Sequence, residues 1–205
     1  MRAVLQRVKG ATVHVNGNLV SRTGPGLVAL IGIGTDDTMA EIEPLAKRLL
    51  STKLWNEGQK ASAIDVPVQY APLDSAAKSR TSAEEEAGKS RSESDEKLSG
   101  GEGSRAEEVW GGRPWRSSVQ DIEGEILCVS QFTLHARLSK GTKPDFHKVS
   151  HGGQQAREIY DALLERLRSA YKPDRIKDGA FGQMMDVSLT NDGPVTILVD
   201  TAEKK

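Results

Sequence analysis

Apolar and polar residues alternate along the first part of the chain in the way that is typical of β-strands. The alternation runs through residues 2–34, where two apolar runs flank Asn16-Gly17. Asn-Gly between apolar runs is a strong hairpin signal, because both residues tolerate positive φ. A Gly-Pro-Gly turn then leads into LVALIGIG, an apolar run too short for a helix. The pattern predicts an opening β-meander.

Two later stretches change to the three- and four-residue spacing of an amphipathic helix. They lie at about 36–52 and 151–172, and Pro173 ends the second. The first has an apolar stripe of Ile42, Leu45, Ala46, Leu49 and Leu50, and the second one of Ile159, Leu163, Leu164 and Leu167. Pro44 lies inside the first stretch, so it marks either a later start or a kink.

Extended patterns return between and after these helices. Residues 125–134 (EILCVSQFTL) read as a central strand, and residues 181–190 and 195–200 as two strands joined by a turn at 191–194. Short extended pieces lie at 53–55 and 115–119. About eight strands and two helices predict an α+β fold, with an antiparallel sheet or barrel and the helices set apart.

One long polar segment interrupts this pattern. Residues 71–108 hold 16 charged residues and 8 serines, and their only large apolar residues are Leu73 and Leu98. Such a composition cannot bury enough apolar surface to offset the entropy of ordering, so it predicts disorder. We therefore expect a single domain over residues 1–205, interrupted by a disordered insertion at about Ala61 to Val109.

Charge and cysteine content narrow the possible classes. The whole chain has a net charge of −1; residues 71–108 contribute −4, so the rest is mildly basic at +3 and permits, without requiring, an RNA partner. No apolar run approaches the roughly 20 residues of a membrane span, and no signal peptide core opens the chain. The single cysteine, Cys128, is expected in the core. These features predict a soluble cytoplasmic protein.

Candidate chemistry is sparse when it is judged from residue types alone. Ser130, Asp145 and His147 can be imagined as a hydrolase triad, but no G-x-S-x-G motif surrounds Ser130. The histidines are not part of a metal-binding motif such as HExxH, so we expect no metal or other cofactor. Gly193-Pro194 reads as a turn in which the backbone can approach a ligand closely.

Three segments taken together resemble the D-aminoacyl-tRNA deacylase family in its bacterial and eukaryotic form. They are MRAVLQRVKGATVHV, VSQFTLHARLSKGTKPDFH and LTNDGPVTILVD. They contain a Ser-Gln-x-x-Leu motif at 130–134 and an Asn-x-Gly-Pro-Val-Thr motif at 191–196. The likeness covers residues 1–57 and 115–200.

The resemblance implies a homodimer of β-barrel-like subunits with active sites at the subunit interface. The implied reaction is hydrolysis of the ester between a D-amino acid and the 3′ end of tRNA. Gly193-Pro194 is implied to be a cis peptide that reaches into the partner's pocket and excludes L-amino acids. Ser130 and Val195 place the chain in the part of the family that is selective for D-amino acids. Glycine attached to a wrong tRNA is a further expected substrate.

The resemblance also assigns roles to individual residues. Ser130 and Gln131 would lie beside the terminal adenosine, and the Phe132 amide would face the aminoacyl group. Activation is implied to come from the 2′-hydroxyl of the substrate. Thr196 is a second hydroxyl near the reaction, without an adjoining base. The substrate pocket is expected to be lined by Thr133, Phe181, Gly182 and Met185.

Two departures and two alternatives stay open. The acidic insertion lies outside the usual family pattern and is either a tolerated loop or a segment that binds a partner. Position 135 is His, where the family often has Tyr. A tRNA-binding module without catalysis, or a hydrolase that uses Ser130 and His147, would also fit the residues.

Overall fold

The computed structural model describes residues 1–71, 114–138, 141–149 and 153–203. Contacts between residues divide the chain into one compact unit of residues 1–70 and 115–205 and a second unit of residues 71–114. All helices and strands discussed below belong to the first unit. The disorder predicted for residues 71–108 falls, apart from Ala71, outside the described residues.

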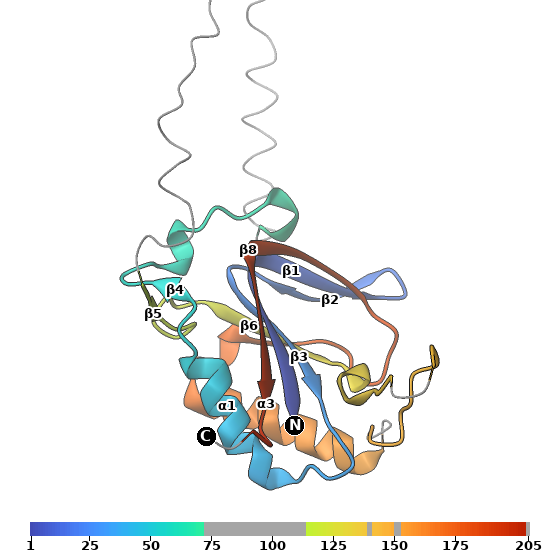
Figure 1. Ribbon diagram of the computed structural model, residues 1–205. Helices are drawn as coiled ribbons and strands as arrows, with labels where there is room; N and C mark the ends of the chain where they lie inside the picture. The colour runs from blue at the N-terminus through green and yellow to red at the C-terminus, as the bar shows by residue number, and fades with distance from the viewer. Residues whose placement is uncertain (72–113, 139–140, 150–152, 204–205) are drawn as a thin grey trace, which may run out of the picture. The chain divides into compact units, whose positions relative to one another are not determined.

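Six strands form the main sheet (Figure 1). They are β1 (Arg2–Val15), β2 (Asn18–Thr23), β3 (Gly26–Gly32), β6 (Glu125–Ser130), β7 (Ile176–Asp178) and β8 (Asp186–Asp200). The long strand β1 pairs antiparallel with β2, β3 and β8. Asn16 and Gly17 turn the β1–β2 hairpin with φ of +51° and +78°, which confirms the expected hairpin. A separate two-stranded sheet pairs β4 (Trp55–Asn56) with β5 (Trp115–Ser117).

The predicted α+β class with a barrel-like sheet and two helices is confirmed, but the expected antiparallel pairing is wrong for part of the sheet. β6 runs parallel to β3, and β7 runs parallel to β6. Parallel neighbours need a crossover connection, usually through a helix. Helix α1 (Ile42–Ser51) lies in the first crossover and helix α3 (Gln154–Ala170) in the second.

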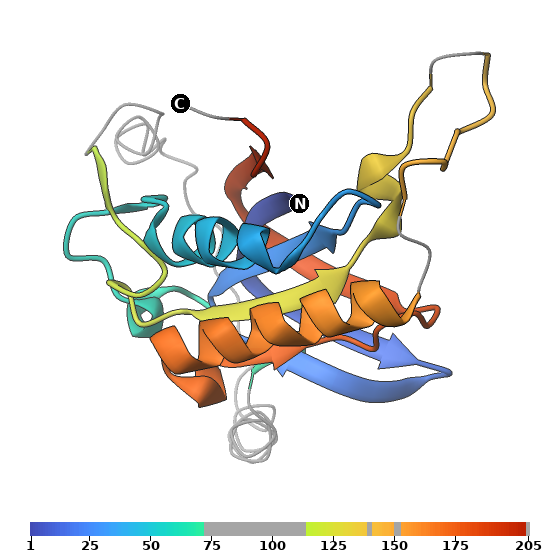
Figure 2. The same cartoon turned by 90° about the horizontal axis from the view of Figure 1, so that it is seen from below.

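Both helices cover one face of the sheet and are shorter than predicted (Figure 2). Pro44 marks a late start of α1, since it lies in the first helical turn. A short 3₁₀ turn, Met39–Glu41, precedes α1 and is capped by Thr38. The predicted apolar stripes of both helices are buried and, with strand residues, belong to the larger of two core clusters.

Several predicted strand boundaries are wrong; the strand expected to start at 181, for example, starts at Asp186. β6 ends at Ser130, and a 3₁₀ turn, η5 (Phe132–His135), follows where strand was expected to continue to Leu134. The expected turn at 191–194 is instead part of β8, a single strand of 15 residues. β8 keeps its pairing with β1 because register shifts around Val8 absorb the irregular backbone there.

The predicted insertion also begins too early. Within its first ten residues lie two 3₁₀ turns, Ala61–Ala63 and Val68–Tyr70. Ala61 donates its backbone N–H to the Ile122 carbonyl at 2.8 Å, and Tyr70 is buried. The ring of Tyr70 lies over Gly10, where a Cβ would come within 2.5 Å of the Tyr70 Cβ. Residues 61–70 are therefore structured parts of the first unit.

Cys128 lies in the core, as predicted, and this gives a chemical test of the fold. It is fully buried in β6, and burial raises the pKa of its thiol to about 12. Because the thiolate is the reacting form, we expect native Cys128 to react with iodoacetamide at pH 8 at least about 100-fold more slowly than the unfolded chain. Mass spectrometry with and without guanidinium measures this, and an added thiol at exposed Ser62 (Ser62→Cys) serves as the reactive control. Rapid native labelling of Cys128 would contradict its buried position.

Candidate active site

The residues of the Ser-Gln-x-x-Leu motif and the predicted pocket residues come from neighbouring parallel strands. Ser130 is the last residue of β6, and residues 179–185 follow β7 directly. The Gly179 N–H donates to the Cys128 carbonyl at 2.9 Å, which fixes the start of the second segment beside β6. Since the carboxyl ends of parallel strands meet at one edge of a sheet, the two predicted groups of residues are brought to the same edge.

Hydrogen bonds shape the turn that follows Ser130. The Gln131 N–H donates to the Ile31 carbonyl at 2.7 Å and anchors the turn to β3. The Gln131 side-chain amide donates to the Thr133 hydroxyl at 2.6 Å. Thr133 therefore orients Gln131 rather than standing as a separate polar group. Phe132 projects from the turn with 50% of its surface exposed.

His135, the last residue of the same turn, attaches it to the chain that follows β3. Its Nε2 lies 3.3 Å from the Gly32 carbonyl and 3.8 Å from a carboxylate oxygen of Asp37. The ring fits because Gly32 and Gly34 lack side chains; a Cβ at either would come within 3.1 or 2.9 Å of it. Burial lowers the pKa of His135 and favours the neutral ring. Arg2 adds a hydrogen bond of 3.1 Å to the Leu134 carbonyl.

Helix α3 contacts residues 179–185, the segment after β7 that was predicted to line the substrate pocket. The Phe181 ring lies 5.2 Å from the Tyr160 ring and 5.4 Å from the Arg157 guanidinium, both on α3. Tyr160 donates its hydroxyl hydrogen to Asp178, the last residue of β7, at 2.7 Å. Burial raises the pKa of this Asp178 carboxyl. Phe181 is thus fixed in place by the helix, and stacking of adenine on its ring stays a prediction.

The remainder of this segment is less enclosed. The Met185 sulfur accepts a hydrogen bond of 3.2 Å from the Ala180 N–H and packs on the smaller core cluster. Gly182, which lies between Ala180 and Met185 in the sequence, is exposed and has a φ of +73°. Residues 180–185 thus form the turn that connects β7 to β8.

Gly193 and Pro194 lie exposed on β8, and their peptide bond is cis. Gly193 has a φ of +132°. The segment is held by Arg7 of β1, whose Nε donates to the Asp192 carbonyl at 2.9 Å and pairs with its carboxylate at 3.0 Å.

The Arg7 guanidinium also contacts Leu54 and Trp115, so it connects the Asp192–Pro194 segment to these two residues. Its Nη1 donates to the Leu54 carbonyl at 2.5 Å, and its Cζ lies 5.3 Å from the Trp115 ring. Burial lowers the pKa of Arg7, and Asp192 opposes this. Arg7 was not predicted as a site residue, because in the sequence it is one polar position of an alternating strand.

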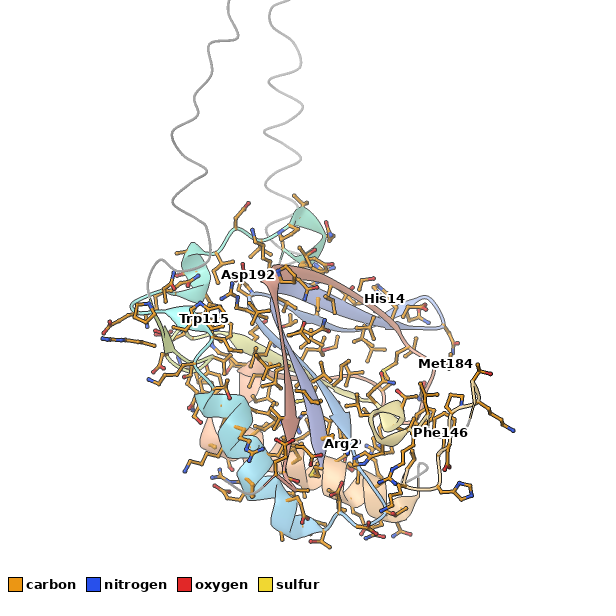
Figure 3. The ribbon with its side chains drawn as sticks, viewed as in Figure 1. Arg2, His14, Trp115, Phe146, Met184 and Asp192 are labelled. Carbon is orange, nitrogen blue, oxygen red and sulfur yellow. The ribbon has the colours of Figure 1, made fainter. Side chains whose placement is uncertain are left out.

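Gly193-Pro194 and Thr196 do not meet Ser130 within one chain. Thr196 of β8 pairs with Gln6 of β1. Both β1 and β3 lie between β8 and β6 in the sheet. Along the curved sheet this path is three strand spacings, or about 14 Å. Figure 3 shows Asp192 and Trp115 on one side of the unit and the labels of Met184 and Phe146 on the opposite side. Within one subunit the two motifs therefore form separate places on the surface.

The structure gives no support to a Ser-His-Asp triad. His147 is exposed and hydrogen-bonded to Asp145, which raises the pKa of His147. Among the described residues, no hydrogen bond joins Ser130 to a histidine. No three His, Cys, Asp or Glu side chains in the described part of the chain gather as metal ligands would.

Comparison with known proteins identifies the family. The model of the family described as D-Tyr-tRNA(Tyr) deacylase matches residues 4–71 and 104–200. The chain belongs to the D-Tyr-tRNA(Tyr) deacylase family. Relatives named D-aminoacyl-tRNA deacylase include one from Yarrowia lipolytica, 38% identical over 100% of both chains. Another, from Drosophila melanogaster, is 38% identical over 100% of this chain and 95% of the relative.

Solved structures agree with the fold of this family. One described as c-Myc DNA Unwinding Element Binding Protein is 34% identical, covers 98% of both chains and has a TM-score of 0.68. Another, described as a probable eukaryotic D-amino acid tRNA deacylase, has a TM-score of 0.60 at 17% identity over 97% of both chains. The family model skips residues 72–103, a narrower interval than the insertion predicted from the sequence. Within the described residues, no helix is both long and apolar enough to cross a bilayer.

Proposed function

We propose that this deacylase-family chain hydrolyses the ester between a D-amino acid and the 3′-terminal adenosine of tRNA, in the cytoplasm. The observation that carries the proposal is that the Ser130–Thr133 turn and the 179–185 segment follow the neighbouring parallel strands β6 and β7, at an edge where Phe132 is exposed. The family match, which includes both motifs, supplies the reaction class. The relatives named above are called D-aminoacyl-tRNA deacylases, in agreement with this reaction.

The active unit in this proposal is a homodimer. Gly193 and Pro194 are exposed and lie apart from Ser130 of their own chain, so they can serve a pocket only in a second copy. The same strand carries Leu198, which is 68% exposed, and Val187, which is 36% exposed. A second copy would cover this apolar face of β8. Carbonyl groups at Gly193-Pro194 would then crowd the space that an L side chain needs, whereas glycine, without a side chain, would enter.

Activation of the reaction is assigned to the 2′-hydroxyl of the terminal ribose. The described residues place no histidine or carboxylate on Ser130, and Thr196 lies on another strand. The protein then contributes positioning and backbone hydrogen-bond donors, with the Phe132 amide toward the aminoacyl group. Positioning alone contributes several kcal/mol in well-oriented reactions, about 7 kcal/mol or more at its best.

The deciding experiment measures release of amino acid from D-tyrosyl-tRNA and L-tyrosyl-tRNA in parallel, with a chelator present. We expect rapid hydrolysis of the D ester alone. Loss of both esters would indicate an unselective esterase, and retention of both with tRNA bound would leave a binding module. His147→Ala is expected to keep the kcat of the parent on the D ester, because its ring bonds only Asp145 among the described residues; a variant without turnover would favour the Ser-His hydrolase.

A further inference from the structure

The segment that follows the catalytic turn projects from the body of the unit as an arm. We define the arm as residues 136–138 and 141–149, which Figure 2 shows extending beyond η5. Its two sides are joined by hydrogen bonds between the backbones of Arg137 and Asp145, at 2.8 and 2.9 Å. Val149 is buried and forms a bridge with Gly34, which anchors the returning side to the end of β3. The arm is therefore joined directly to the edge that carries the site.

The surface of the arm combines basic and apolar groups. Arg137, Lys143 and Lys148 are exposed, with Asp145 as the acidic residue between them and Asp36 lying 3.9 Å from Lys148. Leu138 is 71% exposed, and the Phe146 ring lies 5.6 Å from the Phe132 ring of the catalytic turn. Phe132 and Leu138 thus offer apolar surface to solvent at the base of the arm, next to the partly exposed Phe146 ring.

We propose that the arm binds the single-stranded 3′ end of tRNA, and this rests on the proposed function. A terminal adenosine at Ser130–Phe132 must continue into unpaired nucleotides next to Phe132 and Phe146. Aromatic faces accept stacked bases of any sequence, and basic side chains follow the phosphates; this combination is typical of single-strand binding surfaces. Arg137 and Lys143 contact phosphates, and Phe146 stacks on a base.

The first test measures binding of uncharged tRNA to the full-length protein by fluorescence anisotropy at several salt concentrations. Each phosphate contact to a single strand contributes about 0.7 to the slope of log affinity against log salt. We expect Arg137→Ala with Lys143→Ala to reduce the slope by about 1.4 and to weaken binding about tenfold. The matched control is Lys53→Ala with Lys172→Ala, which removes two exposed charges elsewhere and should leave the slope unchanged.

A second comparison tests stacking. Phe146→Leu should weaken binding of tRNA about tenfold, whereas Phe146→Tyr, which keeps the ring, should bind like the parent. The difference should disappear with tRNA that lacks its terminal CCA nucleotides. Equal affinity of the Leu and Tyr variants for intact tRNA would overturn the role of Phe146.

Activity on two substrates separates this inference from the proposed function. With 3′-O-(D-tyrosyl)adenosine, which has no upstream phosphates, the Arg137/Lys143 variant should be as active as the parent, and with D-tyrosyl-tRNA it should have a higher KM. Equal impairment on both substrates, an unchanged salt slope, or an altered oligomeric state by sedimentation would each overturn the arm as a tRNA surface. If the parent hydrolyses neither substrate, the proposed reaction fails while binding of uncharged tRNA still decides the role of the arm.

Discussion

Gly193→Ala is expected to reduce hydrolysis of D-tyrosyl-tRNA at least about 100-fold, because small displacements at a reaction centre have effects of this size. A Cβ at position 193 would lie 2.8 Å from a methyl carbon and 2.9 Å from the backbone nitrogen of Val195. The φ of +132° is also one that side chains rarely adopt. The backbone must therefore shift at the place where the proposed chiral selection occurs. The free energy of unfolding should fall by only about 1–3 kcal/mol.

Gly17→Ala is the matched control for this result. Gly17 also has a positive φ, of +78°, but nothing lies within 4 Å of a Cβ placed there. The free energy of unfolding of the Gly17→Ala variant should fall by about 1 kcal/mol, and its hydrolytic activity should be unchanged. Parallel rates with D- and L-tyrosyl-tRNA and urea unfolding measure both variants. A fully active Gly193→Ala enzyme would show that this part of β8 takes no part in the reaction.

Arg7→Ala is expected to lower the free energy of unfolding by about 2–3 kcal/mol and to impair chiral selection. The substitution leaves the Leu54 carbonyl and the Asp192 carboxylate without the guanidinium that bonds both. The Asp192–Pro194 segment then loses its attachment to β1, so the D ester is hydrolysed more slowly and the preference over the L ester shrinks. Urea unfolding and the ratio of D to L rates measure the two effects.

Two further variants identify the cause of the Arg7 effect. In a double variant with Asp192→Ala, the loss should be smaller than the sum of the single losses by about 1 kcal/mol, because the two side chains contact each other. Arg166→Ala breaks an exposed ion pair with Glu43 and should cost less than about 1 kcal/mol. If Arg7→Ala lost stability but kept its full D/L ratio, Arg7 would be a structural residue only.

The hairpin turn, the apolar helix stripes and the core cysteine depend mainly on residues close in sequence, and these three were predicted correctly. The β1–β2 hairpin follows from Asn16-Gly17, since both residues of its turn need positive φ. The apolar stripes of α1 and α3 follow from helical spacing, and the core position of Cys128 follows from its apolar strand. The three family segments could be recognised for the same reason, because each is a short continuous pattern.

The candidate site was predicted in its parts but not in its arrangement. The residues around Ser130 and Phe181 were named from the resemblance, and their roles stay predictions. The supports were missed: Arg7 under Asp192, His135 between Gly32 and Asp37, and the α3 residues behind Phe181. Each of these contacts joins residues far apart in sequence, so no local spacing indicates it.

The sequence alone determined the β1–β2 hairpin, the apolar stripes of the two helices, the core position of Cys128 and the resemblance to the family. Only the tertiary structure decided the parallel order of β3, β6 and β7 and the continuity of β8 through Gly193-Pro194. It also decided that this peptide and Ser130 lie on different parts of one chain. The physical reason is that strand direction and strand ends depend on crossovers and on hydrogen-bond partners in distant segments, whereas hydrophobic periodicity reports only which side of an element is buried.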